Sequence, residues 1–416
     1  MSKNNSNFFK EKNNWSVIKD KLLGCYLSPY FQKVLMTKKP IYYVDCFAGK
    51  GKFEDGNDGS PLIALQVRED CLNRTNVTQK TGAIQPCFIE LNHAIELQKN
   101  IDTFNSNYGS ANVISGKYEE TILDCLSNKK DYNIFLYIDP YGIKALNFEL
   151  FGKFKMLGFN TFEMLINFNS FGFFRNACKV MSVNYSNDEA LISLDDLIEY
   201  EPTTFDTNFQ SETLLNSIAG GDYWKDIVRD FNDNKFDGYK AEQILSDRYK
   251  QQLKKHFSYV LDLPIRLKAG QRPKYRMIHA CDHKDGCFLM AQNMQKRKEE
   301  LFLNIQQSGQ LTLFDIIPEC SSTAEGDFIT MEEITEKVGK LLNDYHEIGL
   351  TEYIAAFVNE YGLICDFKTI YDSLNSLAQK NEVKILRNPA YKKNGKQSTF
   401  WEESKGKTVT LRRCKS

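Results

Sequence analysis

The residues with the clearest chemical potential follow an apolar segment near the N-terminus. This segment runs into Asp45, and a glycine-rich turn follows in the pattern D-x-F-x-G-x-G. Glycines in such a turn tolerate positive φ and let a ligand approach the backbone, and the helix that normally follows offers free N–H groups. P-loop spacing is absent, and the dinucleotide fingerprint is incomplete because position 54 is Glu. The pattern favours an S-adenosylmethionine site; the alternative is a tight turn in any α/β protein.

Two later segments are suited to the same cofactor. Glu90 ends a second apolar segment, where an acidic residue of a doubly wound sheet usually binds ribose hydroxyls. Its interval from Gly51 exceeds the usual ~20 residues, which an insert at 52–61 and a polar stretch at 73–85 explain. Gly116 lies where many such enzymes place a Gly-Asp pair beside adenine, although Lys117 replaces the acid. The predicted cofactor-binding residues are Asp45, Phe47, Ala48, Gly49, Gly51, Glu90 and Gly116.

A third segment, Asp139-Pro140-Tyr141, could hold a methyl acceptor. It is similar to the (Asp/Asn/Ser)-Pro-Pro-(aromatic) signature of amino-methyltransferases, in which a carboxylate and a carbonyl orient an exocyclic amine while the aromatic ring stacks on a flipped base. Here there is one proline, and Gly142 follows Tyr141. We therefore keep three alternatives: methylation of a base amine, methylation of another atom, and no methyl transfer, with Asp139 only capping the next segment.

The cysteines and histidines do not indicate a metal site. His279, Cys281, His283 and Cys287 offer four ligands, but their spacing matches no common zinc pattern. The eleven cysteines include no C-x-x-C pair, and several lie in apolar segments, as reduced core cysteines do. Because no apolar run reaches about 18 residues and the N-terminus is polar, we expect a soluble, cytoplasmic protein.

The elements that must position these residues alternate strand with helix. We predict helices at 12–37, a Rossmann-like doubly wound sheet of the class I methyltransferase type, and an insert at about 179–258. This domain spans residues 1–304, and a linker at 305–327 follows. The predicted strands, the last antiparallel, are Ile41–Val44, Pro86–Ile89, Ala111–Ser115, Asn133–Ile138, Thr161–Phe168, Tyr259–Arg266 and Tyr275–Ala280.

The remaining residues, 328–416, predict a winged helix-turn-helix domain with a basic tail. Three short helices (Met331–Asn343, Leu350–Tyr361, Phe367–Lys380) precede a hairpin formed by Val383–Leu386 and Thr399–Trp401. From Lys380 to Ser416 there are eleven Lys or Arg against three Glu, which favours phosphate contact in a chain of net charge −1. The alternative is a protein-interaction module or structural cap. The predicted nucleic-acid-binding residues are Lys392, Lys393, Lys396, Arg412 and Arg413.

Taken together, these segments resemble the three-Cys-motif partner protein (TcmP) family. The resemblance covers most of the chain and lies in Trp15–Leu22, YVDCFAGKGKFEDGNDGSPLIAL (43–65), FIELN (88–92), YIDPYG (137–142), GGDYW (220–224) and YRMIHACDHKDGCFLM (275–290). It implies a class I methyltransferase-like fold and a partner with clustered cysteines, which suggests a radical-type iron–sulfur enzyme.

Two functions are consistent with these residues. The first is an S-adenosylmethionine-dependent nucleic-acid methyltransferase that works with the three-cysteine protein, with Asp139, Pro140 and Tyr141 positioning the acceptor. The second is a non-catalytic, methyltransferase-like partner that binds DNA or RNA and delivers it to the three-cysteine protein. The irregular Asp-Pro-Tyr-Gly segment, Lys117 and the basic tail motivate the second.

Overall fold

The structure is a computed structural model that describes residues 14–76, 80–104, 106–140, 142–143, 145–185, 188, 208–265, 275–307 and 329–414. It divides into two compact units, Met1–Asp282 and His283–Ser416, and each is described by itself. Across the described ranges, no helix combines the length and apolar character needed to cross a bilayer.

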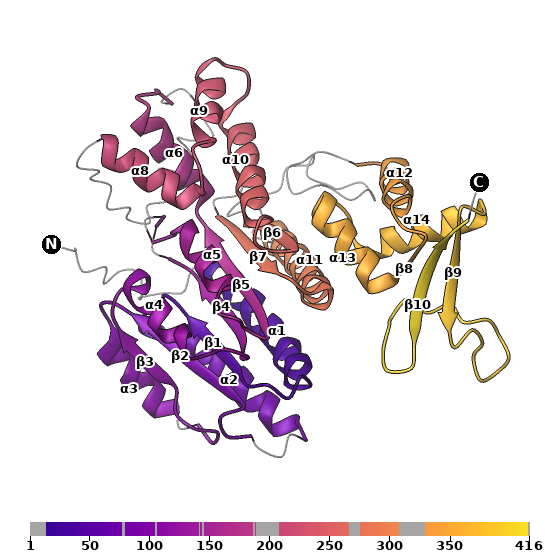
Figure 1. The fold of residues 1–416 in the computed structure, drawn as a ribbon, viewed down its shortest axis with the longest axis horizontal. Helices are drawn as coiled ribbons and strands as arrows, with labels where there is room; N and C mark the ends of the chain where they lie inside the picture. Colours follow the sequence, from indigo (N-terminus) through magenta and orange to yellow (C-terminus); the bar gives the residue numbers. More distant parts are fainter. Residues whose placement is uncertain are drawn as a thin grey trace. The chain divides into compact units, whose positions relative to one another are not determined.

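The first unit is built on one seven-stranded sheet (Figure 1), in the order β3-β2-β1-β4-β5-β7-β6. β7 runs antiparallel to both of its neighbours, whereas β1 to β5 are parallel. The arrangement matches the predicted Rossmann-like methyltransferase fold, including its antiparallel strand. The predicted strands agree with the observed ones to within two residues at each end: β1 (Ile41–Asp45), β2 (Ile84–Glu90), β3 (Asn112–Ser115), β4 (Asn133–Ile138), β5 (Thr161–Phe168), β6 (Tyr259–Ile265) and β7 (Tyr275–Cys281).

Helices cover both faces of this sheet because each buried strand turns alternate side chains to opposite sides. On one face, Tyr43 of β1 packs against Phe135 of β4, which also contacts Tyr30 of α1. On the other face, Tyr42 and Val44 join a large core with side chains of α4 and α5. Within the described residues, the helices of this unit are α1 (Asn14–Leu35), α2 (Ser60–Arg74), α3 (Ala94–Phe104), α4 (Tyr118–Ser127), α5 (Phe148–Lys155), α6 (Ser170–Val180), α8 (Asn208–Ala219), α9 (Trp224–Asn232) and α10 (Gly238–Leu253).

A buried charged network fixes the end of the sheet to α10. Arg276 of β7 is 4% exposed and donates through Nε and one terminal nitrogen to Glu242 of α10, at 2.7 and 2.9 Å. Its other terminal nitrogen lies 2.6 Å from Asp262 of β6, and Asp262 also accepts from Lys250 at 2.7 Å. Each charge in the network is therefore paired, as burial requires.

The second unit contains α11 (Lys284–Gln307), α12 (Met331–Leu342), α13 (Leu350–Tyr361), α14 (Phe367–Gln379) and an antiparallel sheet in the order β8 (Glu347–Gly349), β10 (Thr408–Arg413), β9 (Val383–Asn388). α11 belongs to this unit: the Phe288 ring stacks on Phe367 of α14, and the Cys287 thiol donates to the Ala355 carbonyl of α13. The division therefore falls at Asp282, earlier than the predicted domain end at residue 304. Most of the predicted linker, residues 308–327, lies outside the described residues.

One predicted strand of this unit is wrong. Thr399–Trp401 does not pair with β9; the returning strand is β10, nearer the C-terminus. The Trp401 ring instead stacks on Tyr371 of α14 at 4.7 Å, and Arg387 lies 4.8 Å from the same ring. This aromatic segment, whose sequence predicts a strand, therefore packs on a helix instead. Two residues of the predicted basic tail, Arg412 and Arg413, lie within β10.

We predict that Arg276→Met destabilises the protein by about 3–5 kcal/mol, since it leaves Glu242 and Asp262 buried without their main counter-charge. Unfolding in urea, followed by circular dichroism, measures the change. Arg229→Met is the matched control: Arg229 also pairs with a carboxylate, but both partners are more than half exposed, so we expect a loss within about 0.5 kcal/mol. Equal losses in the two variants would contradict this assignment.

Candidate functional site

Three predicted site residues meet at the carboxyl edge of the parallel strands. β1 lies between β2 and β4, so that Asp45 at its end is level with Phe88 of β2 and Tyr137 of β4. Glu90 follows two residues after Phe88, and Asp139 two residues after Tyr137. The strand order reverses between β1 and β4, which is the place where open α/β sheets bind their ligands.

The turn after β1 depends on two glycines with positive φ, Gly49 (62°) and Gly51 (76°). A Cβ atom on Gly51 would lie 2.9 Å from Leu97 Cδ1 of α3, so a larger residue would have to shift this side chain and would also be strained by the positive φ. The buried Ala48 donates its N–H to the carbonyl of Ile89 at 3.0 Å, which holds the turn against the end of β2.

The predicted insert in this turn forms a small hairpin. Lys52 and Asp58 form a bridge, and Phe53 N–H donates to Asn57 O at 2.8 Å. At its base, Gly59 N–H donates to Gly51 O at 2.9 Å. The hairpin therefore closes on itself, and α2 begins at Ser60 directly after it.

The Glu90 carboxylate joins the glycine turn to the start of α3. One oxygen accepts from Gly49 N–H at 2.8 Å, and the other accepts from the N–H groups of Asn92 (2.8 Å) and His93 (3.0 Å). These are charge-assisted hydrogen bonds, the stronger kind in proteins. A carboxylate offers about four acceptor positions, so roughly one stays available for a ligand hydroxyl.

Asp45 is fully buried, and its carboxylate accepts from Ser60 Oγ at 2.6 Å and Phe47 N–H at 3.2 Å. Burial raises the pKa of Asp45 to about 7, although these two hydrogen bonds lower it; the negative charge of Asp139 adds to the increase. The proton affinity of Asp45 is therefore sensitive to any cation that enters the site.

Asp139 is held by three side chains. Lys19 Nζ of α1 lies 2.8 and 3.1 Å from its two oxygens, Asn167 Nδ2 of β5 lies 2.7 Å away, and Tyr137 Oη lies 3.1 Å away. The carbonyl oxygen of Asn167, a residue 5% exposed, has no hydrogen-bond partner among the described residues. Pro140 is buried beside this group, and Tyr141 lies outside the described residues.

The sequence reasoning missed Lys19 and Asn167. Lys19 lies in the N-terminal segment that carries the family resemblance, yet nothing local links it to a residue 120 positions later. Asn167 is a polar residue in an otherwise apolar strand end, which is the signal that could have identified it.

The remaining predicted cofactor residues are Gly116, directly after β3, and Phe47, which contacts the start of α4. Gly116 N–H donates to Glu90 O at 3.1 Å, and a Cβ atom on Gly116 would lie 2.9 Å from Thr121. The Phe47 ring packs against Tyr118 with ring centres 5.2 Å apart. Lys117 is exposed, and its ammonium group forms an ion pair with Glu120 in the first turn of α4 at 2.9 Å.

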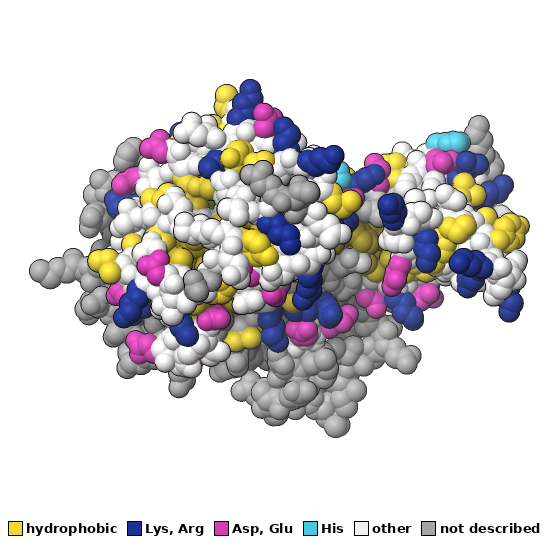
Figure 2. Space-filling model, turned by 90° about the horizontal axis from the view of Figure 1, so that it is seen from below, with side chains coloured by type: hydrophobic (Ala, Val, Ile, Leu, Met, Phe, Trp, Pro, Cys, Tyr) yellow, Lys and Arg dark blue, Asp and Glu magenta, His cyan; other side chains and the backbone are white. Residues whose placement is uncertain are grey.

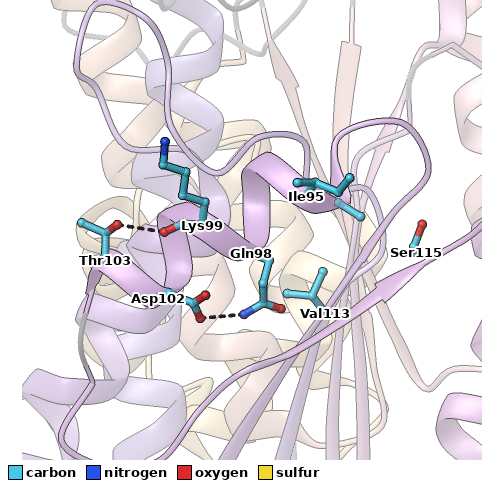
Figure 3. A pocket seen from close by; sticks show the side chains of 8 residues that line it. Ile95, Gln98, Lys99, Asp102, Thr103, Val113 and Ser115 are labelled. Carbon is cyan, nitrogen blue, oxygen red and sulfur yellow. Dashed lines mark hydrogen bonds between the residues drawn. The ribbon is translucent and has the colours of Figure 1, made fainter.

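An open groove of about 680 Å³ lies between α3 and β3 (Figure 3). Its walls include Ile95, Lys99 and Val113, and Gln98 donates to Asp102 within it at 2.8 Å. It contains none of the predicted site residues, but Ser115 pairs with Glu90 across β2 and β3 and is the neighbour of Gly116. This groove therefore borders the carboxyl-edge cluster on the side of β3.

In the second unit, three predicted nucleic-acid-binding residues share one loop. Lys392, Lys393 and Lys396 are exposed between β9 and β10, where Lys392 N–H donates to Lys396 O at 2.8 Å. Arg412 instead pairs with Glu347 at 2.6 Å, and Arg413 donates to the Asn343 carbonyl. Figure 2 shows several Lys and Arg side chains on the face of this unit that it presents.

The segment with four possible metal ligands, residues 279–287, begins with a buried histidine that already has a partner. His279 is buried in β7 and contacts Glu163 at 3.0 Å, and Glu163 also accepts from Tyr26 Oη at 2.5 Å. Within the described ranges, no three His, Cys, Asp or Glu side chains are grouped to hold a metal ion.

Comparisons with known proteins give distant likenesses. No protein-family model matches the chain, and no curated protein matches it. Among solved structures, it is similar to a candidate caffeoyl-CoA O-methyltransferase from Staphylococcus aureus (13% identity, TM-score 0.29, 61% of this chain and 82% of that one). It is also similar to the plantazolicin methyltransferase BamL in complex with a triazolic desmethylPZN analogue and SAH (12% identity, TM-score 0.30, 65% and 86%). At such TM-scores, neither likeness bears on function.

We predict that Asp45 gives the protein a defined pH dependence. Its folded pKa of about 7 exceeds the unfolded value of about 3.9, so its contribution to stability is fully present below about pH 4 and is lost as the pH rises through about 7. Wild-type protein should therefore lose stability relative to Asp45→Asn between about pH 5 and pH 8. Urea unfolding at both pH values measures this, with Glu120→Gln, an exposed carboxylate, as control. An identical pH dependence in wild type and Asp45→Asn would contradict it.

Proposed function

We propose that this protein is an S-adenosylmethionine-dependent methyltransferase. The observation that carries the proposal is the meeting of Asp45, the positive-φ Gly49 turn and Glu90 at the reversal point of the sheet. This constellation suits a cofactor with a ribose and a positively charged methionine end: Glu90 offers an acceptor to the ribose hydroxyls, and the positive charge would favour the ionised form of Asp45, which burial disfavours.

The residues present fit this cofactor. Glu90 keeps roughly one acceptor position for a ribose hydroxyl beside the turn, and Gly51 and Gly116 let the backbone pack closely against Leu97 and Thr121. Leu91, next to Glu90, exposes 52% of its surface and offers an apolar contact for adenine. When bound, the cofactor supplies an electrophilic methyl group; Glu90 orients the ribose and Asp45 balances the positive charge.

We infer that the acceptor is an amino group of a nucleic-acid base. Asp139 and the unpaired carbonyl oxygen of Asn167 are hydrogen-bond acceptors from adjacent strands, suited to an N–H-bearing acceptor. Lys19 balances the charge of Asp139 and keeps its carboxylate in place. Pro140 and Tyr141 complete the acceptor segment in this proposal.

The second unit suits nucleic-acid binding as a winged helix-turn-helix domain. Its helices α12, α13 and α14 precede the β9–β10 hairpin, whose loop carries Lys392, Lys393 and Lys396. We propose that α14 and this loop contact the nucleic-acid backbone. We also propose that the chain is a member of the TcmP family and works with a three-cysteine-motif protein in the cytoplasm, on the strength of the motifs at 43–65 and 275–290.

One observation favours a second candidate, a non-catalytic partner that binds nucleic acid and delivers it to the three-cysteine protein. The Asp139 carboxylate already receives hydrogen bonds from Lys19, Asn167 and Tyr137. An acceptor amine must compete with these donors or displace one of them. In the non-catalytic candidate the cluster is only structural, and the lysine loop carries the function.

We predict that purified protein binds S-adenosylmethionine and that Glu90→Ala weakens this binding at least tenfold, or ~1.4 kcal/mol, since it removes both the ribose acceptor and the bond that holds Gly49. Isothermal titration calorimetry measures both affinities. Glu120→Ala, which removes an exposed carboxylate on α4, is the control and should bind like wild type. Absence of binding in folded wild-type protein would overturn the methyltransferase proposal and favour the non-catalytic candidate.

We predict that replacing Lys392, Lys393 and Lys396 with Ala weakens nucleic-acid binding and makes it less sensitive to salt. On duplex DNA, the slope of log K against log salt should fall by roughly 0.9 for each phosphate contact that is lost. Fluorescence anisotropy over a salt series measures the slope. A variant with Lys38, Lys39 and Lys130 replaced, three exposed lysines of the first unit, should keep the wild-type slope. Equal slopes in all three proteins would exclude the loop as the binding site.

A further inference from the structure

Two thiols from different elements of the first unit are in contact. Cys87 lies in β2 and Cys125 in α4, and their sulfur atoms are 3.5 Å apart. Both are free thiols; Cys87 is fully buried and Cys125 is half-buried. A disulfide bond requires a separation of about 2.05 Å, so an approach of about 1.5 Å would join them. A small reagent can reach Cys125 first, because Cys125 is partly exposed whereas Cys87 is fully buried.

The surroundings of Cys125 favour its thiolate. Cys87 lies within hydrogen-bonding distance, and Tyr42 Oη lies 3.0 Å from the Cys125 sulfur. Lys129 Nζ lies 4.2 Å from the centre of the Tyr42 ring, so a positive charge borders the group. The hydrogen bond from Cys87 lowers the pKa of Cys125 to about 7 against the effect of burial, helped by Tyr42 and Lys129. The pKa of Cys87 is raised by the same hydrogen bond and by burial.

We propose that Cys87 and Cys125 form a peroxide-reactive dithiol, with Cys125 as the attacking sulfur and Cys87 as the resolving thiol. The proposal rests on the contact between two elements that the fold brings together, the partial exposure of one sulfur, and the hydroxyl and ammonium groups beside it. It does not depend on the proposed cofactor site.

The reaction takes a peroxide as its oxidant. The Cys125 thiolate attacks one peroxide oxygen, the O–O bond breaks, and hydroxide leaves, which gives a sulfenic acid on Cys125. Cys87 then loses its proton and attacks that sulfur, the S–O bond breaks, and water leaves as the disulfide forms. Two thiols and one hydrogen peroxide thus become one disulfide and two waters; both sulfurs are oxidised and both peroxide oxygens are reduced.

Other cysteines of the unit provide internal controls. Cys71 and Cys178 are buried, and burial raises their pKa values to about 11 and about 12. Cys46, also buried, is close enough to Cys125 for their charges to interact, so a Cys46–Cys125 link is the competing product. A test must therefore identify which cysteines are joined.

The test treats the full chain, as purified, with about equimolar hydrogen peroxide, blocks the remaining thiols with N-ethylmaleimide, and maps the peptides without reduction by mass spectrometry. We expect the Cys87–Cys125 link to form first, on the order of tenfold faster than an ordinary cysteine is oxidised. Cys71 and Cys178 should stay alkylated, and dithiothreitol should restore both thiols. Three results would overturn the proposal: Cys125 left unoxidised, a dominant Cys46–Cys125 link, or sulfinic acid on Cys125 while Cys87 is still alkylated.

Variants separate the two roles. In Cys87→Ser, sulfenic acid should accumulate on Cys125 and be trapped by dimedone; in Cys125→Ser, Cys87 should stay a thiol. Tyr42→Phe removes the hydroxyl at 3.0 Å and should slow oxidation of Cys125 several-fold without changing the product. Circular dichroism establishes that each variant is folded. Rapid oxidation of Cys87 in Cys125→Ser would overturn the assignment of roles.

Discussion

The carboxylate of Glu90 is the constraint on which the carboxyl edge of the first unit depends. It accepts a hydrogen bond from one N–H group of the glycine turn and from two N–H groups just before α3. These two segments are separate in sequence. Asn100 of α3 adds a bond to the Lys50 carbonyl at 2.8 Å. Because a half-buried N–H group must find an acceptor, removing this carboxylate would leave the donors of Gly49 and His93 unpaired at once. The turn, the end of β2 and α3 therefore keep their positions together.

The two aspartates of the cluster lie in different environments. Asp45 is enclosed and receives hydrogen bonds from neutral donors, so burial favours its protonated form. Asp139 faces the ammonium of Lys19 and is anchored from β5 by Asn167. Under the proposed function, Asp45 balances the charge of the cofactor and Asp139 positions the acceptor. Two carboxylates of one site commonly take different roles when their surroundings differ. α1 is thus part of the site through Lys19, besides covering one face of the sheet through its aromatic residues.

The fold of the first unit could be predicted because three of its parallel strands, β1, β2 and β4, contain apolar runs that lead directly into an acidic residue, namely Asp45, Glu90 and Asp139. The contacts that complete the site could not. Lys19 and Asp139 are 120 residues apart, and Cys87 and Cys125 are 38 apart, so only the packed structure brings them together. Local pattern also failed at Trp401, because an aromatic residue suits a strand and a helix-packing contact equally well.

The hairpin inside the glycine turn has a consequence for how this site can vary among relatives. Since Gly59 closes on Gly51 at its base, residues 52–58 form a hairpin whose two ends are held together above the turn. Loop closure costs little for added residues, so lineages can lengthen, shorten or replace this hairpin at small energetic cost. Motif searches that require a constant spacing between the strand and the helix would then overlook relatives with a longer or shorter hairpin. For protein engineering, the same feature makes residues 52–58 a natural position for a tag or a reporter peptide beside the site.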